Sequence, residues 1–275
     1  MSTGIGGNAA ATARQATRQA GPWVERLARM GYAARGTVYV IVGIIAAQAA
    51  RGERGVTDQR GVFAEILSRP GGKFMLGILA VGLIGFSVWR FVEAGLDPEN
   101  DGGAKRALFA LSGAIHVGLA LTAVRMALGS SSGGGSSEDD WTARALGAPG
   151  GRFLVAAVAL GIAGFGLYQI FQAYNAKLDK RLDFSRLPAG TRVWATRAAR
   201  AGLAARGVVF AVIGFFLLRA AFQEDAGETR GMAGALRALH DTSYGPWLLG
   251  LVALGLICFG ATELLKARYR RIQPA

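Results

Sequence analysis

A six-residue block occurs twice in this chain, and each copy opens a long apolar segment. The copies read Gly-Tyr-Ala-Ala-Arg-Gly at residues 31–36 and Gly-Leu-Ala-Ala-Arg-Gly at residues 202–207. A more divergent copy at residues 112–117 places His116 where the other two copies have Arg35 and Arg206. Because repetition is the signature of a structure assembled from copies of one unit, the sequence predicts three related units.

The composition indicates that this chain folds in a lipid bilayer. Hydrophobic residues make up 52% of its 275 residues and charged residues only 18%. A helix needs about 20 mostly apolar residues to cross roughly 30 Å of hydrocarbon, and lipid leaves unpaired backbone groups unsatisfied, so segments of this kind are helices. We therefore expect an all-α protein with six transmembrane helices, at residues 31–50, 74–92, 107–128, 153–173, 202–222 and 247–265.

The second helices of the three units also align. They start at Gly-Gly-Lys-Phe (71–74), Gly-Gly-Arg-Phe (150–153) and Tyr-Gly-Pro-Trp (244–247). Each unit is thus a helical hairpin, and three hairpins of the same orientation predict parallel repeats in a pseudo-threefold bundle. The expected organisation is a mobile cytoplasmic tail at residues 1–22, followed by hairpin repeats at 23–98, 104–178 (divergent) and 194–272. Short amphipathic pieces at 62–67, 141–146 and 232–239 separate the two helices of each hairpin and suit surface helices.

The distribution of basic residues predicts the topology. The net charge is +13. The N-terminus, the second and fourth loops and the C-terminus carry nearly twice as many Lys and Arg residues as the other three loops. By the positive-inside rule both termini are cytoplasmic. We expect the basic excess to attract anionic lipid headgroups and not to bind nucleic acid.

The repeated blocks, the three hairpins and the six spans resemble the bacterial family known as domain of unknown function 1206. Its members typically carry this two-helix unit three times. The resemblance extends over roughly residues 23–272 and implies an integral protein of the bacterial cytoplasmic (inner) membrane. His116 departs from the pattern of the other two repeats.

Three polar residues inside the apolar segments are the candidate site. Arg35 and Arg206 lie four to five residues inside their segments, roughly 6–8 Å below the boundary, and His116 occupies the same register. Charged residues in membrane helices are costly and often functional, so one interpretation is a polar cluster that holds an anion, a lipid phosphate or a carboxylate. The other is that each Arg fixes its own hairpin at the interface. Glu93 and Glu263 are the candidate ion-pair partners of the two arginines.

Glycines on the second helices predict close helix packing. In lipid, helices associate through small residues that let their backbones approach. The candidate helix-packing residues are Gly82, Gly85, Gly161, Gly164 and Gly255.

The sequence contains no recognisable catalytic, cofactor or metal motif. The two histidines and the single cysteine have no zinc-site spacing, and no nucleotide-binding or hydrolase signature occurs. We therefore expect a protein that is not an enzyme and binds neither cofactor nor metal. The leading hypothesis is a structural or interaction component that recognises lipid, a membrane partner or a second copy. The alternative is a transporter or channel with a cationic central path that favours small anions.

Overall fold

The computed structural model describes residues 4–53, 55–96, 103–129, 138–175, 188–223 and 232–269. Long helices form the first hairpin from α1 (Gly4–Ala50) and α3 (Gly72–Leu96), with the short α2 (Gln59–Leu67) between them. The second repeat contains α4 (Gly103–Ala127), α5 (Glu138–Leu146) and α6 (Gly151–Tyr174). The third contains α8 (Ala189–Gln223), α9 (Met232–His240) and α10 (Gly245–Tyr269).

Six of these helices confirm the expected membrane spans. Within the described residues, α1, α3, α4, α6, α8 and α10 are long and apolar enough to cross a bilayer. Helix α1 begins at Gly4, so residues 4–22 of the expected tail continue the first spanning helix, and residues 1–3 lie outside the described part. All regular secondary structure in the described residues is thus helical, with two long helices and one short helix per repeat.

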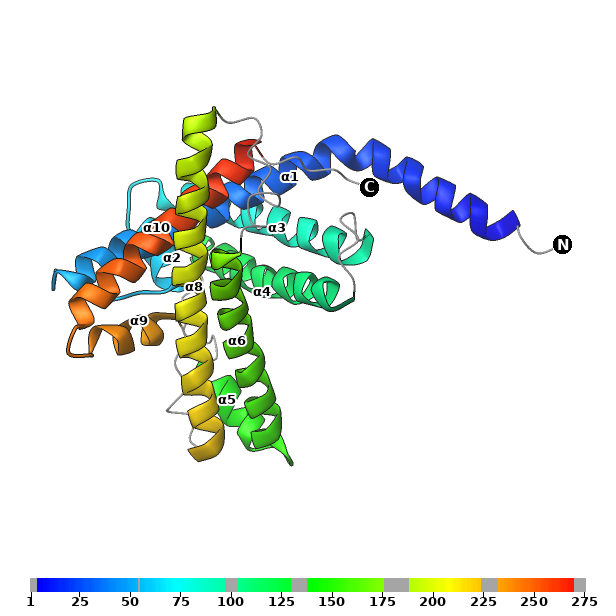
Figure 1. Cartoon of the computed structure of the whole chain (residues 1–275). Helices are drawn as coiled ribbons and strands as arrows, with labels where there is room; N and C mark the ends of the chain where they lie inside the picture. Colours follow the sequence, from blue (N-terminus) through cyan, green and yellow to red (C-terminus); the bar gives the residue numbers. More distant parts are fainter. Residues whose placement is uncertain are drawn as a thin grey trace.

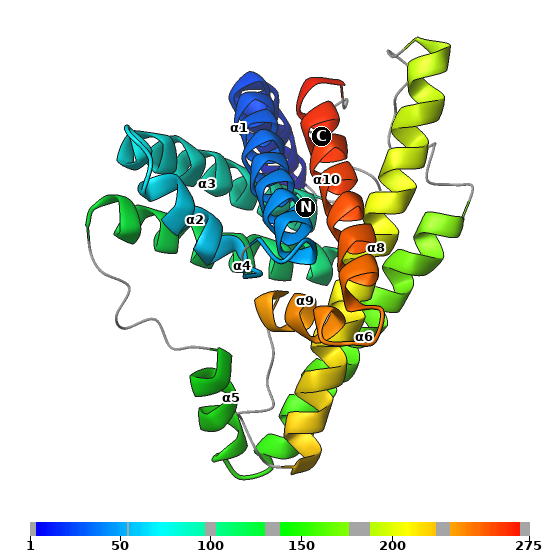
Figure 2. The same cartoon turned by 90° about the vertical axis from the view of Figure 1, so that its left-hand side faces the viewer.

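The three repeats contact one another in the same way and in cyclic order, so that the third repeat contacts the first. The second helix of each repeat packs along the first helix of the next, as α3 on α4, α6 on α8, and α10 on α1. Figures 1 and 2 show these pairs side by side, with α1 and α10 between the other two and the α6–α8 pair running across the α3–α4 pair. Within repeats, α1 packs on α3 and α8 on α10.

The middle repeat departs from this pattern. Helices α4 and α6 are not among the described elements that pack extensively on each other. A Cβ added at Gly161 or Gly164 meets no atom within 4 Å among the described residues, so these two candidate packing residues face open space. Gly82 and Gly85 do lie at close contacts, because an added Cβ would stand 2.6 Å from Ala34 Cβ and from the Leu27 carbonyl oxygen respectively. Gly255 of α10 packs in the same way against Ala205 of α8.

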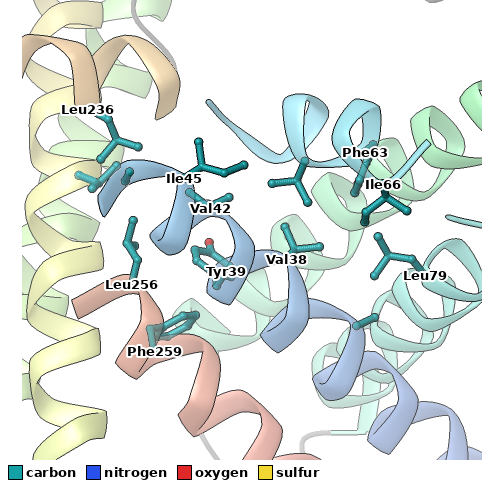
Figure 3. Close-up of a cluster of buried hydrophobic side chains, with 14 of the residues drawn as sticks. Val38, Tyr39, Val42, Ile45, Phe63, Ile66, Leu79, Leu236, Leu256 and Phe259 are labelled. Carbon is teal, nitrogen blue, oxygen red and sulfur yellow. The ribbon is translucent and has the colours of Figure 1, made fainter. Parts of the chain in front are cut away.

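The short helices α2 and α9 cover one end of the bundle. Val62, Phe63 and Ile66 of α2 and Leu236 of α9 are buried in the same apolar cluster as the last turns of the α1 span. Figure 3 shows Phe63, Ile66 and Leu236 together with Val42 and Ile45 of α1. The apolar faces of α2 and α9 therefore pack on the protein itself. Gly71 and Gly150 make the turns that follow α2 and α5 with φ of 73° and 72°, a left-handed conformation that favours glycine.

Two close helix crossings occur at glycine pairs. A Cβ added at Gly36 of α1 would lie 2.8 Å from the carbonyl oxygen of Gly260 in α10, and the reverse distance is 2.6 Å. Gly207 of α8 and Gly166 of α6 meet in the same way, with both distances 2.6 Å. The last glycine of the repeated block therefore lies where its helix crosses the second helix of another repeat. In cyclic order this is the preceding repeat: the third repeat for Gly36 and the second repeat for Gly207.

The crossing predicts that Gly260→Ala destabilises the protein. The new methyl group would overlap the α1 backbone, and overpacking of this kind costs about 1–3 kcal/mol. Gly250→Ala in the same helix is the matched control, because the nearest atom to its added Cβ is Ala50 Cβ at 3.9 Å. Thermal unfolding of the full-length protein in detergent should show a lower midpoint for Gly260→Ala only. Equal midpoints for the two variants would contradict the crossing.

Candidate functional site

The repeated block directs one arginine into the centre of the bundle. Its first glycine packs against the second helix of the same repeat, since a Cβ added at Gly31 would lie 2.6 Å from Phe86 Cα, and Gly202 meets Phe259 equivalently. Its last glycine crosses the preceding repeat. The arginine immediately before that glycine consequently lies between its own repeat and the preceding one.

Arg35 is buried and ion-paired. Arg35 is 5% exposed, and its Nη1 donates a hydrogen bond to Glu263 Oε2 of α10 at 3.0 Å. The other carboxylate oxygen, Glu263 Oε1, accepts from Lys266 Nζ at 2.6 Å. The guanidinium carbon also lies 5.0 Å from the ring centroid of Phe86 and 5.2 Å from that of Phe259. Desolvated cation–π contacts of this kind stabilise by about 2 kcal/mol.

Arg206 occupies the equivalent position among aromatic rings. Its guanidinium carbon lies 4.8 Å from the ring centroid of Phe210, 5.0 Å from that of Phe259 and 5.9 Å from that of Phe165. Its Nε is buried and has no hydrogen-bond partner among the described residues. Phe259 is therefore shared by Arg35 and Arg206.

His116 approaches the same centre from α4. Its ring centroid lies 4.5 Å from that of Phe86, and Nδ1 lies 2.7 Å from the Ser112 carbonyl oxygen one turn earlier. Because Phe86 also contacts Arg35, the rings of Phe86 and Phe259 connect all three candidate residues. The structure thus brings Arg35, His116 and Arg206 to one centre.

Of the two candidate acids, the structure places Glu263 beside Arg35. Glu93 of α3 instead accepts a hydrogen bond from Arg90 Nη1 at 2.7 Å, one turn earlier on its own helix. Arg90 also lies over the rings of Phe86 and Phe109, at 4.8 and 5.2 Å. Glu93 therefore holds a cation that belongs to the α3–α4 contact.

Tyr39 is a central residue that the sequence analysis did not single out. It lies one helical turn after Arg35, is 6% exposed, and its ring lies 5.7 Å from Arg35 Cζ and 5.8 Å from Arg206 Cζ. Its hydroxyl group interacts electrostatically with both guanidinium groups. Figure 3 shows Tyr39 on α1 facing Phe259 of α10. The sequence could have pointed to Tyr39 through its position one helical turn after the repeated arginine. The tyrosine is not repeated, however, because repeats two and three have Ala120 and Phe210 at that position.

The functional groups at the centre of the bundle are guanidinium groups, a side-chain amide and aromatic rings. Among the residues that the structure describes, no group of three or more His, Cys, Asp and Glu side chains is placed to hold a metal ion. The arrangement can hold helices together and can neutralise negative charge.

We expect Arg35 and Glu263 to be strongly coupled in stability. Removing one partner of a buried ion pair strands the other charge and costs about 3–5 kcal/mol, so Arg35→Met and Glu263→Gln should each destabilise the protein, and the double variant by much less than their sum. The control cycle uses Arg69 and Glu65, whose side chains are 67% and 26% exposed. Exposed pairs couple by about 0.2–1 kcal/mol. Unfolding free energies in mixed micelles give both coupling energies, and additive effects at Arg35 and Glu263 would contradict the prediction.

Comparison with known proteins agrees with three copies of one unit. The family described as Domain of Unknown Function (DUF1206) matches residues 30–97, 107–176 and 201–270. The uncharacterized protein YxxB of Bacillus subtilis (strain 168) is 32% identical over 256 residues, which cover 91% of this chain and 93% of that protein. No solved structure matches the chain. The chain is a multi-pass membrane protein that belongs to the DUF1206 family and carries its repeat three times.

Proposed function

We propose that this protein is a non-enzymatic structural or interaction component of the bacterial cytoplasmic membrane. The observation that carries the proposal is the buried Arg35–Glu263 pair, which joins α1 to α10 under the rings of Phe86 and Phe259. A charge that is neutralised and covered by packed rings connects helices and does not line a conducting path. The central polar residues then hold the three repeats in a fixed arrangement.

The surface for interaction is the outer face of α4, α6 and α8. In each of these helices, only 22% of an apolar 18-residue stretch is buried inside the protein. The corresponding share is 61% for α1 and 50% for α3 and α10. Large apolar side chains project outward from α6, including Leu160, Leu167 and Phe171. Lipid, a membrane partner or a second copy of the chain would cover this face.

A photo-crosslinking residue placed on α6 tests the interaction role. Substitution at Leu167, which is 61% exposed, should trap a defined protein adduct in native membranes. The same substitution at the fully buried Ala159 of α6 is the matched control and should trap none. Identical adduct patterns at the two positions would contradict a specific contact.

We further propose that both termini are cytoplasmic and that the basic loops on that side bind anionic headgroups in preference to nucleic acid. The excess of Lys and Arg in the second and fourth loops and at both ends supports this orientation. A membrane-impermeant thiol reagent should fail to label an added cysteine after Ala275 in intact cells and should label it in inverted vesicles, in a Cys258→Ala background. Labelling in intact cells would reverse the orientation.

The alternative function is a path for small anions. The positive charge of Arg206 at the centre of the bundle favours it. Anion flux into proteoliposomes separates the two functions, because the scaffold predicts no flux above that of protein-free vesicles. Flux that Arg206→Gln abolishes would replace the scaffold with a transporter.

A further inference from the structure

The two glycine crossings place corresponding polar residues opposite each other. In the α10–α1 contact, Glu263 follows the crossing glycine Gly260 by three residues and meets Arg35, which precedes Gly36. In the α6–α8 contact, Gln169 follows the crossing glycine Gly166 by three residues. Arg206 precedes Gly207 on the other side of that contact. Gln169 therefore occupies, for Arg206, the register that Glu263 occupies for Arg35.

Gln169 is a buried residue whose side-chain amide makes no hydrogen bond with the described residues. The residue is 3% exposed, and neither its amide nitrogen nor its amide oxygen has a hydrogen-bond partner among the described residues. Buried polar side chains are nearly always hydrogen-bonded, and an unsatisfied one calls for an explanation such as an ion. The buried Nε of Arg206 is a further unsatisfied donor at the same contact.

The charge of Arg206 also lacks a carboxylate of its own. No described Asp or Glu lies within ion-pair distance of it. Glu263 acts on it electrostatically, but the two oxygens of that carboxylate are already engaged by Arg35 and Lys266. The α3–α4 contact differs, because Arg90 is paired with Glu93. At the α6–α8 contact, Arg206 is thus a central cation that has no ion-paired carboxylate among the described residues.

We propose that a small monovalent inorganic anion, of the size of chloride, binds at the α6–α8 contact between the guanidinium group of Arg206 and the amide N–H groups of Gln169. A buried charge requires a counter-charge, and an amide in place of the acid supplies donors that an anion accepts. The guanidinium group of Arg206 carries a single positive charge, which one monovalent anion would balance. The backbone contact of Gly166 with Gly207 favours a small ion over a phospholipid headgroup.

The anion is a structural counter-ion, so the inference goes beyond the scaffold function and needs no transport. It predicts that the purified full-length protein is stabilised by chloride. A ligand that binds only the folded state at a hundredfold excess over its dissociation constant raises the folding equilibrium about 100-fold. The test titrates sodium chloride against sodium gluconate at constant ionic strength and follows the unfolding midpoint of the protein in an uncharged detergent.

Gln169→Glu is the decisive variant, because it places a carboxylate in the register that Glu263 occupies. It should unfold in gluconate at or above the wild-type midpoint and should lose the response to chloride. Gln172→Glu, on the next turn of α6, is the matched control and should keep the response. Arg206→Gln should also lose it.

Three results would overturn the proposal. The first is a wild-type midpoint that does not depend on chloride. The second is a chloride response that Gln169→Glu retains, which would place the ion elsewhere. The third is stabilisation by phosphatidylglycerol vesicles but not by chloride, which would assign the contact to a lipid phosphate. The flux measurement stays separate, because a protein that binds chloride without conducting it satisfies both this inference and the scaffold function.

Discussion

In the described part of this protein, α1 crosses α10 glycine to glycine at Gly36 and Gly260, and α8 crosses α6 in the same way at Gly207 and Gly166. Lipid supplies little hydrophobic drive for helix association, so close backbone approach through glycine is the main source of packing energy between such helices. Each crossing sets the residue before it, an arginine, between two repeats. The positions of the central rings and charges follow from these two contacts.

The three contacts between repeats have different charges at the same register of the second helix. The second-helix residue that faces the centre is Glu263 in α10, Gln169 in α6 and Arg90 in α3. The acid neutralises Arg35, the amide leaves Arg206 in excess, and Arg90 is paired with Glu93 of its own helix. Repeats that began as copies have thus become chemically distinct at the residues that meet. The result is a pseudo-symmetric scaffold in which Arg206 has no ion-paired carboxylate among the described residues.

Much of the architecture could be predicted because its causes are local. The spans follow from about 20 apolar residues each, and the repeats from the blocks at 31–36 and 202–207. The pairing of Glu263 with Arg35 was among the expected arrangements. Tyr39 and Gly166 were not singled out, because their importance depends on which neighbouring helix they face. Gly161 and Gly164 have the pattern of packing residues, yet α6 packs on α8 through Gly166 and leaves them in open space.

The sequence by itself determined the membrane class, the six helices and their division into three units, since hydrophobic length and repetition act within short stretches of chain. Only the tertiary structure decided which acid meets which arginine, that Phe86 and Phe259 join the three candidate residues, and that α4 and α6 do not close on each other. These features depend on contacts between residues that are far apart in the chain. Helices cross where their backbones can approach most closely, and no single helix contains that information.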